Sequence, residues 1–328
     1  MKKPGVFIVG REAGGIAALK PIEVILKKDN LVTIDSDYFN FLLTDTSVGE
    51  WAIEKALIVN CRPFGMPTLS VLDFWSNYTA RFADAQGNLV YLPDTIAVMD
   101  ELAVSEMVAE GFPREKLVIT GQPAFDCLAD KRRMFSNSIA SEARQAAIRL
   151  LYGFRKGHKT IVFCSQPLSR QEYSYGYDEQ QVLRLLIDAL PKDVDLIIRP
   201  HPRDDLADLM HFQDAPRITV QRKDYVHDLL MAADLVVGMN SEILVEACYL
   251  GCRVLSIQPG IDFNLDRLPS NRNGHSYPLY DVHWLPYIME SFLCNRDRDA
   301  NFIEPIIEFP EPAAPKVARL IYERLGIA

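Results

Sequence analysis

The stretch ADLVVGMNSEILVEACYLGCRVL, residues 233–255, predicts a strand, a short turn, a helix and a second strand. The apolar run at its start has the length of a buried strand. Asn240 and Ser241 are residue types that cap the start of a helix, and Gly251 suits the left-handed conformation that often ends one. A strand, a helix and a strand in this order form the βαβ unit of a parallel sheet.

A helix that begins directly after a parallel strand makes this turn a candidate phosphate site. The free N–H groups and the dipole of such a helix face the carboxyl edge of the sheet, where both favour an anion. Glu242 and Glu246 are four residues apart and share one helix face, so either could accept hydrogen bonds from a ribose diol. A plain crossover whose cap and acids are solvated is the alternative.

Two other strands of the same half deliver polar side chains at their carboxyl ends. The run DLIIRPHP places Arg199 and His201 after a buried strand, and a guanidinium and an imidazole held there suit a diphosphate or a nucleotide. Ser165 and Gln166 follow another predicted strand, and ordinary loops and turns are the alternative for these segments. The predicted nucleotide site comprises Ser165, Gln166, Arg199, His201, Asn240, Ser241, Glu242 and Glu246.

Apolar runs alternate with helical patterns along the chain, which predicts an α/β fold of two Rossmann-like domains whose parallel sheets face a central cleft. A chain of 328 residues also exceeds the usual size of one domain. We place an N-terminal domain at residues 1–135, a polar connector at 136–157 and a C-terminal domain at 158–328. A last amphipathic helix over 316–325 is expected to pack across both domains.

The composition, with 48% hydrophobic and 24% charged residues, is that of a globular protein. A net charge of −9 argues against a nucleic-acid-binding protein, which carries a basic face. No apolar stretch reaches the roughly 18 residues of a transmembrane segment, and the N-terminus lacks a signal-peptide core, so we expect a cytoplasmic protein. The six cysteines form no CxxC pair, which favours buried thiols over a metal site.

These segments resemble motifs of the GT-B superfamily, which includes nucleotide-sugar glycosyltransferases, UDP-N-acetylglucosamine 2-epimerases and bacterial sialyl-, polysialyl- and glycerophospho-transferases. His201-Pro202 resembles the His-Pro motif of the transferases, and Asn240-Ser241 resembles their serine motif. The stretch 241–246 also resembles an epimerase pattern, a Ser-Gly-Gly turn before a Glu-Glu pair. Here Glu242 and Ile243 replace the glycines, and only the second glutamate, Glu246, is retained.

The N-terminal half extends the resemblance over nearly the whole chain. GREAGG, residues 10–15, resembles the glycine-bearing loop after the first strand, and VITGQP, residues 118–123, resembles the Thr-Gly-Asn-Pro stretch that closes the N-terminal domain. The resemblance implies a nucleotide-activated donor on the C-terminal domain, an acceptor of unknown identity on the N-terminal one, and no cofactor. Such proteins are found as monomers and as homodimers.

The His-Pro and serine motifs favour a metal-independent transferase that moves a sugar or a related group from the donor to the acceptor. A sugar-nucleotide 2-epimerase or hydrolase, and a non-catalytic nucleotide-binding protein, are the alternatives. Transfer needs a general base for the acceptor hydroxyl and positive charge for the leaving phosphate. The catalytic candidates are Asp45 and Asp73, either of which could be the base, and His201 beside the phosphate.

Other polar residues are candidates for contacts with the sugar or the acceptor. Asp73, Asn77 and Arg81 share one face if their segment is helical, and a helix cap with a surface partner is the alternative. The loop after the predicted strand 253–257 is expected to overhang the predicted cleft, and a solvated loop is the favoured alternative. The sugar- and acceptor-side candidates are Gly14, Gly15, Asn77, Arg81, Asp262, Asn264 and Arg267.

Overall fold

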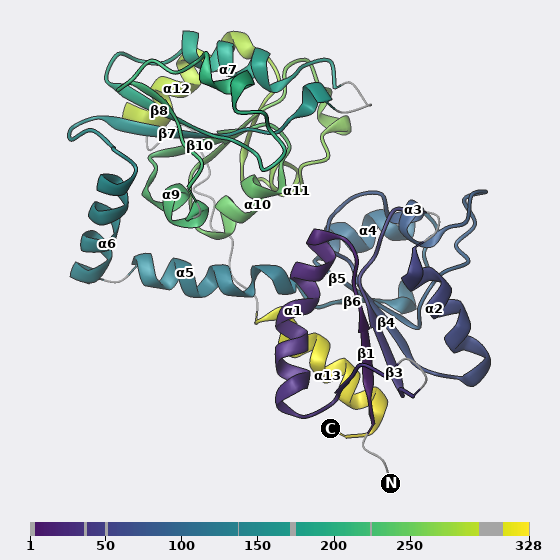
Figure 1. Ribbon diagram of the computed structural model, residues 1–328. Coiled ribbons are helices and arrows are strands. Elements are labelled where there is room, and N and C mark those ends of the chain that lie inside the picture. Colours follow the sequence, from purple (N-terminus) through teal and green to yellow (C-terminus); the bar gives the residue numbers. More distant parts are fainter. Residues whose placement is uncertain are drawn as a thin grey trace. The chain divides into compact units, whose positions relative to one another are not determined.

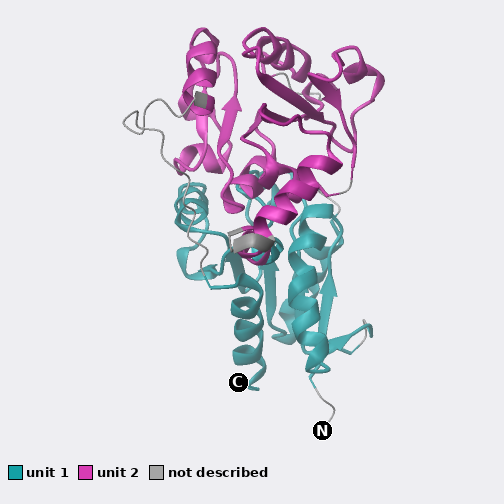
Figure 2. Cartoon of the chain, turned by 90° about the vertical axis from the view of Figure 1, so that its left-hand side faces the viewer, with its two compact units in different colours: residues 1–127, 309–328 teal, residues 128–308 magenta. Residues whose placement is uncertain are grey.

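The structure is a computed structural model that describes residues 4–35, 38–49, 52–136, 138–170, 175–223, 225–294 and 311–327. Its contacts divide the chain into two compact units, and the last helix returns to the first of them (Figure 2). Unit 1 comprises residues 1–127 and 309–328, and unit 2 comprises residues 128–308. Each unit contains a six-stranded parallel sheet with helices around it, which confirms the predicted α/β class (Figure 1).

The sheet of unit 1 has the strand order β2-β1-β3-β4-β5-β6, and all of its pairs are parallel. Its strands are β1 (Val6–Val9), β2 (Val32–Thr33), β3 (Phe41–Thr44), β4 (Thr68–Val71), β5 (Thr95–Val98) and β6 (Leu117–Ile119). Its helices are α1 (Ala13–Lys28), α2 (Ile53–Cys61), α3 (Tyr78–Phe82), α4 (Glu101–Ala109) and α13 (Ala313–Leu325).

Alternating side chains of the strands build a core on each face of this sheet. Phe41 and Leu43 pack with α1 and α13 on one face, whereas Leu42 between them packs with Ile58 of α2 on the other. All three strand side chains are almost fully buried, and each side chain of this size stabilises the fold by about 1.5–3 kcal/mol. The buried side chains of α13 belong to the unit 1 core, which corrects the expectation that this helix packs across both domains.

The sheet of unit 2 has the strand order β12-β11-β10-β7-β8-β9 and is also parallel throughout. Its strands are β7 (Lys159–Cys164), β8 (Val194–Arg199), β9 (Ile218–Val220), β10 (Leu235–Gly238), β11 (Val254–Ile257) and β12 (Tyr277–Leu279). Its helices include α6 (Ser138–Leu151), α7 (Glu179–Asp188), α9 (Val226–Ala232), α10 (Glu242–Tyr249) and α12 (Leu285–Cys294). The strand–helix–strand prediction for residues 233–255 is therefore confirmed.

The segment between the two sheets is helical. Helix α5 (Asp126–Ser136) leads from unit 1 into unit 2, and α6 packs against α9. None of the helices in the described ranges has the length and apolar character needed to cross a membrane.

Candidate functional site

In unit 2, three neighbouring strands bring the predicted nucleotide residues to one edge of the sheet. The strands β10, β7 and β8 are adjacent and parallel, so their carboxyl ends lie side by side. The backbone N–H of Ser165 donates to the carbonyl oxygen of Arg199 at 2.9 Å, which fixes the exit of β7 beside that of β8. On the other side, a Cβ atom added to Gly238 would lie 3.3 Å from the carbonyl oxygen of Cys164, so β10 approaches closely.

Four predicted residues at this edge hold buried polar atoms that have no hydrogen-bond partner among the described residues. They are Ser165 Oγ, Gln166 Oε1, Arg199 Nε and Asn240 Oδ1. Buried polar groups in folded proteins are nearly always hydrogen-bonded, because an unpartnered one costs about 1–3 kcal/mol. A group of them on three adjacent strand ends is therefore typical of a site that a polar ligand fills.

Helix α10 starts at the same edge. Ser241 is its N-cap residue, as predicted, but the Ser241 side chain makes no capping hydrogen bond to the helix. The turn before it is fixed by Ser256, whose Oγ donates to the carbonyl oxygen of Met239 at 2.5 Å. The helix dipole therefore points at the strand ends, and the Ser241 hydroxyl is not used by the cap.

His201 follows β8 and is partly buried. Its backbone N–H donates to Asp204 Oδ2 at 2.7 Å, and its Nδ1 accepts the N–H of Arg203 at 3.1 Å. Burial lowers the pKa of the imidazole below its usual 6.5, against the opposing charge of Asp204. The ring is therefore neutral at pH 7, with its proton on Nε2, where it can donate to a ligand.

Glu246 lies on α10 near this edge and already has a protein partner. Burial raises the pKa of the Cys164 thiol at the end of β7 to about 12. The charge of Arg199 opposes this rise and the charge of Glu246 adds to it, so both side chains lie near the end of β7. The Oε2 atom of Glu246 contacts Nε2 of His227 on α9. Sequence spacing gives no sign of this pair, because its members lie on different helices.

In unit 1, Asp45 directly follows β3 and is fully buried, with 0% of its surface exposed. Its Oδ2 accepts the backbone N–H groups of Arg11 at 2.8 Å and Glu12 at 3.2 Å, at the start of α1, and its Oδ1 has no partner among the described residues. Burial raises the pKa of Asp45 from 3.8 to about 6, more than these two N–H groups lower it. A carboxyl group with this pKa suits a general base at neutral pH.

The glycine pair of the first loop makes room for the two candidate bases. A Cβ atom on Gly15 would lie 2.3 Å from Asp45 Oδ2, and one on Gly14 would lie 2.6 Å from Asp73 Oδ2. Real Cβ atoms do not approach other atoms so closely, so only glycine fits at either position without a shift of the helix or the carboxylate. Gly14 and Gly15 thus leave the space that the carboxylates of Asp73 and Asp45 fill.

Asp73 forms a buried ion pair with Arg81. The Nη1 atom of Arg81 lies 2.5 Å from Asp73 Oδ1, and the two side chains are only 5% and 10% exposed. The same Nη1 donates to the carbonyl and hydroxyl oxygens of Thr46, at 3.0 Å and 2.7 Å. Burial raises the pKa of Asp73, and the charge of Arg81 opposes that rise. This pair ties Asp73 to the loop that carries Asp45.

The single helix face proposed for residues 73–81 is wrong. Helix α3 starts only at Tyr78, because Asn77 adopts a left-handed conformation with φ of 57° and its exposed side chain lies outside the Asp73–Arg81 pair. In unit 2, Asp262, Asn264 and Arg267 are also exposed, and Asp262 accepts hydrogen bonds from Asn264. These three residues therefore fit the alternative interpretation of this segment, a solvated loop.

Two polar side chains near Asp45 were missed by the sequence reasoning. Glu54, in the first turn of α2, is 2% exposed, and neither of its carboxylate oxygens has a partner among the described residues. Its charge raises the pKa of Asp45. The hydroxyl of Ser47, 3% exposed, is likewise unpartnered. An acidic residue in a first helical turn is usually solvated, so the sequence alone gave no signal for its burial.

No family model matches the sequence, and no curated protein matches it either. Solved structures do. UDP-GlcNAc 2-epimerase from Neisseria meningitidis, bound to UDP-GlcNAc, is 13% identical, with 99% of this chain and 100% of that chain covered at a TM-score of 0.65. The wall teichoic acid polymerase TagF is 10% identical, with 99% and 90% covered at 0.57. Anabaena Alr3699/HepE, in complex with UDP, is 12% identical, with 98% and 97% covered at 0.55.

The chain has the GT-B fold. The fold implied by the resemblance is thereby confirmed, and identities of 10–13% carry no information on activity.

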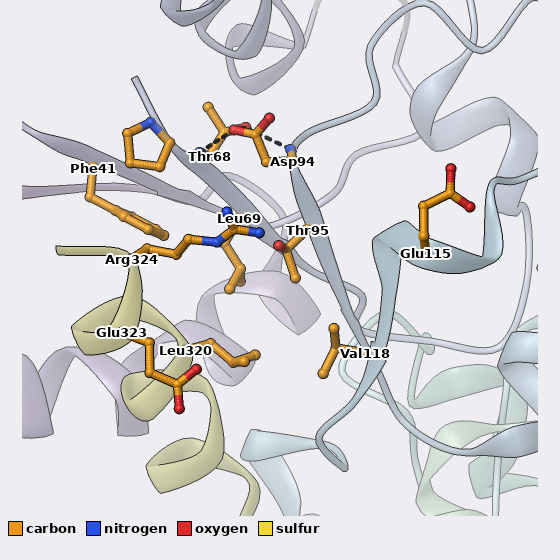
Figure 3. A pocket seen from close by; sticks show the side chains of 11 residues that line it. Phe41, Thr68, Leu69, Asp94, Thr95, Glu115, Val118, Leu320, Glu323 and Arg324 are labelled. Atoms are coloured by element: carbon orange, nitrogen blue, oxygen red, sulfur yellow. Dashed lines mark hydrogen bonds between the residues drawn. The ribbon is translucent and has the colours of Figure 1, made fainter. Parts of the chain in front are cut away.

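The GT-B fold of this chain also contains a cavity of about 270 Å³ in unit 1, away from the predicted residues (Figure 3). Phe41, Thr68 and Thr95, which begin β3, β4 and β5, line it together with Leu320 and Arg324 of α13. It therefore lies at the amino ends of the strands, whereas Asp45 and Asp73 follow the carboxyl ends. Asp94 also lines the cavity, but its Oδ2 already accepts hydrogen bonds from the backbone N–H and the hydroxyl of Thr68, at 2.9 Å and 3.0 Å.

Within the described ranges, no group of three or more His, Cys, Asp or Glu side chains is arranged to hold a metal ion.

Proposed function

We propose that this protein is an enzyme that binds a UDP-activated sugar, or a related donor, at the strand ends of unit 2 and transfers the group to an acceptor. The observation that carries this proposal is the set of four unpartnered buried atoms on β7, β8 and β10 beside the start of α10. Phosphate oxygens match the donors in this set, because Arg199 and Ser165 offer N–H and O–H groups and the helix dipole favours an anion. The choice of uridine rests on the nucleotides bound in two of the similar structures, UDP-GlcNAc and UDP.

The ribose and the leaving phosphate have separate partners in this proposal. Glu246 is a carboxylate that accepts from the ribose diol, while neutral His201 donates from Nε2 to a phosphate oxygen. Arg199 supplies the positive charge that a leaving diphosphate needs, so the proposed transfer requires neither a metal ion nor a cofactor. Asn240 and Gln166 have carbonyl oxygens that can accept from donor groups of the ligand.

Asp45 is our candidate for the general base, in preference to Asp73. Its Oδ1 is unpartnered and its pKa of about 6 leaves it ionised, yet basic, at pH 7 to 8. Asp73 shares its charge with Arg81 and holds the neighbouring loop, which suits a positioning role. The base accepts the proton of the acceptor hydroxyl as that oxygen bonds to the sugar carbon and the phosphate leaves.

A thermal-shift comparison tests the nucleotide site. UDP, CMP, GDP and ADP are each added with and without magnesium; ligand at about a hundred times its Kd adds about 2.7 kcal/mol of stability. Arg199→Met should weaken UDP binding by about 10- to 150-fold, the range for a hydrogen bond to a charged group. Lys192→Met, which removes an equal charge at the exposed start of the same strand region, is the matched control. Equal affinities of the two variants would overturn the site.

Glu54 favours a second candidate function, epimerisation or hydrolysis of the nucleotide sugar. Proton transfers at a sugar ring need several carboxyl groups, and Glu54 adds a third buried one to Asp45 and Asp73. Incubation of UDP-GlcNAc in D₂O without an acceptor separates the candidates. Deuterium at a ring carbon or released UDP indicates the second, whereas consumption that requires an added acceptor indicates transfer.

A further inference from the structure

Three side chains from three helices form a hydrogen-bonded chain in unit 2. Lys131 lies on α5, His227 on α9 and Glu246 on α10. The Nζ atom of Lys131 is 2.5 Å from Nδ1 of His227, and Nε2 of His227 contacts Oε2 of Glu246. The His227 and Glu246 side chains are only 19% and 23% exposed, so both are held in a largely dry environment.

The chemistry of lysine sets the direction of this chain. An ammonium group has three donors and no acceptor, so Nδ1 of His227 must be the acceptor of the Lys131 contact. The ring proton is then on Nε2, which donates to Glu246 Oε2. One carboxylate oxygen of Glu246 is thereby fixed, and its Oε1 has no hydrogen bond described for it.

We infer that His227 is a positioning residue of the nucleotide site, which orients the Glu246 carboxylate so that Oε1 accepts from the ribose hydroxyls of a ribonucleotide. Lys131 acts one step further out, because it selects the tautomer that donates to Glu246. This inference rests on the proposed function, in which Glu246 binds the ribose, and it adds two residues that no motif of the sequence indicates.

Helix α5 also contacts the other end of α10, which supports the same assignment. A Cβ atom on Gly251, just after α10, would lie 3.1 Å from Nε of Arg132. Lys131 thus reaches Glu246 of α10 through His227, and the next residue of α5, Arg132, lies beside the turn that follows α10. The orientation of the donor-site helix and of its glutamate is therefore tied to the helix that enters unit 2 from unit 1.

The test compares the affinities of UDP and 2′-deoxy-UDP, because a carboxylate that reads the ribose diol discriminates between them. We expect the wild-type protein to prefer UDP by about tenfold or more. His227→Leu should lose most of that preference through weaker UDP binding, with a change of less than about twofold for 2′-deoxy-UDP. A general loss of structure would instead weaken both ligands alike, so the ratio separates positioning from folding.

Three further variants make the result decisive. In His227→Gln the amide can donate to Glu246 and accept from Lys131, so it should restore the preference. Lys131 does not contact the ligand in this proposal, yet Lys131→Met should reduce the preference for UDP over 2′-deoxy-UDP. This variant also provides the test if His227→Leu does not fold. His283→Leu, at a side chain 92% exposed in the same unit, is the control. If His227→Leu keeps the wild-type preference for UDP, the inference is overturned and the proposed function is not. If His227→Leu does not fold, an unchanged preference in Lys131→Met has the same meaning. If the wild-type protein binds neither nucleotide, the proposed function is overturned as well.

Discussion

Replacing Asp45 with Asn should stabilise the folded protein at neutral pH while removing its activity. Burial raises the pKa of Asp45 from 3.8 to about 6. Between these values the folded state binds more protons than the unfolded state, so the free energy of unfolding falls as the pH rises. Each pKa unit is worth 1.36 kcal/mol, so above about pH 6 the ionised carboxylate costs the folded state about 3 kcal/mol. The amide introduced by Asp45→Asn cannot ionise and escapes this cost.

Urea denaturation at pH 4 and pH 7.5 measures the effect. The fluorescence of the two tryptophans of unit 1, Trp51 and the buried Trp75, reports its unfolding, provided that the exposed Trp284 of unit 2 is replaced by Phe. The stability gain of Asp45→Asn should be about 2.4 kcal/mol larger at pH 7.5 than at pH 4, because the carboxyl group of the unfolded chain is already partly ionised at pH 4. Glu101→Gln, at an exposed carboxyl group of unit 1, is the control and should show little pH dependence. An equal gain at both pH values would refute the argument that Asp45 is ionised at a cost.

The same variant should lower kcat by about 10²- to 10⁴-fold, the usual contribution of a general base. A more stable but inactive protein is the combination that a strained catalytic group predicts. Full activity in Asp45→Asn would remove Asp45 from the proposed mechanism, whatever its effect on stability.

Three other changes in unit 1 have defined outcomes. Glu54→Gln removes a charge that raises the pKa of Asp45, so the acid limb of the kcat/KM profile should move to lower pH; an unmoved limb would contradict the coupling. Gly15→Ala should cost about 1–3 kcal/mol in denaturation experiments, whereas Gly49→Ala, with no atom within 4 Å of its added Cβ, should cost clearly less. Arg81→Met leaves a buried carboxylate without its cation and should cost about 3–5 kcal/mol at pH 7; a loss below about 1 kcal/mol would show that solvent reaches the pair.

The grouping of polar residues at the carboxyl edge of the unit 2 sheet was largely predictable, because their positions follow from topology. Residues after the carboxyl ends of adjacent parallel strands must meet, so Ser165, Arg199 and Asn240 could be grouped once their strands were recognised. The capping residues and the terminating Gly251 gave the limits of α10 to within one or two residues. Here local sequence signals and the global fold agree.

Side-chain partners that depend on long-range packing were not predictable in the same way. Asp73 and Arg81 would share one face if their whole segment were helical, and they meet instead because the chain turns at Asn77 before α3 begins. Glu54 looks like an ordinary first-turn acid, and only the packing of α2 against the loop of Asp45 reveals its burial. No local pattern records such contacts.

The return of α13 to unit 1 has a consequence for the order in which the protein is made. The core of unit 1 lacks Val317 and Ile321 until the ribosome has synthesised the 185 residues between Cys127 and Ala313 and then α13 itself. At a synthesis rate of about 5–20 residues per second, the apolar face of α1 stays exposed for about 10–40 s before α13 is made. During that time the nascent chain can bind chaperones or misfold. The two chain ends lie at the same end of unit 1 in Figures 1 and 2, so a circular permutant that starts with α13 and continues into β1 should free unit 1 to fold as soon as it emerges.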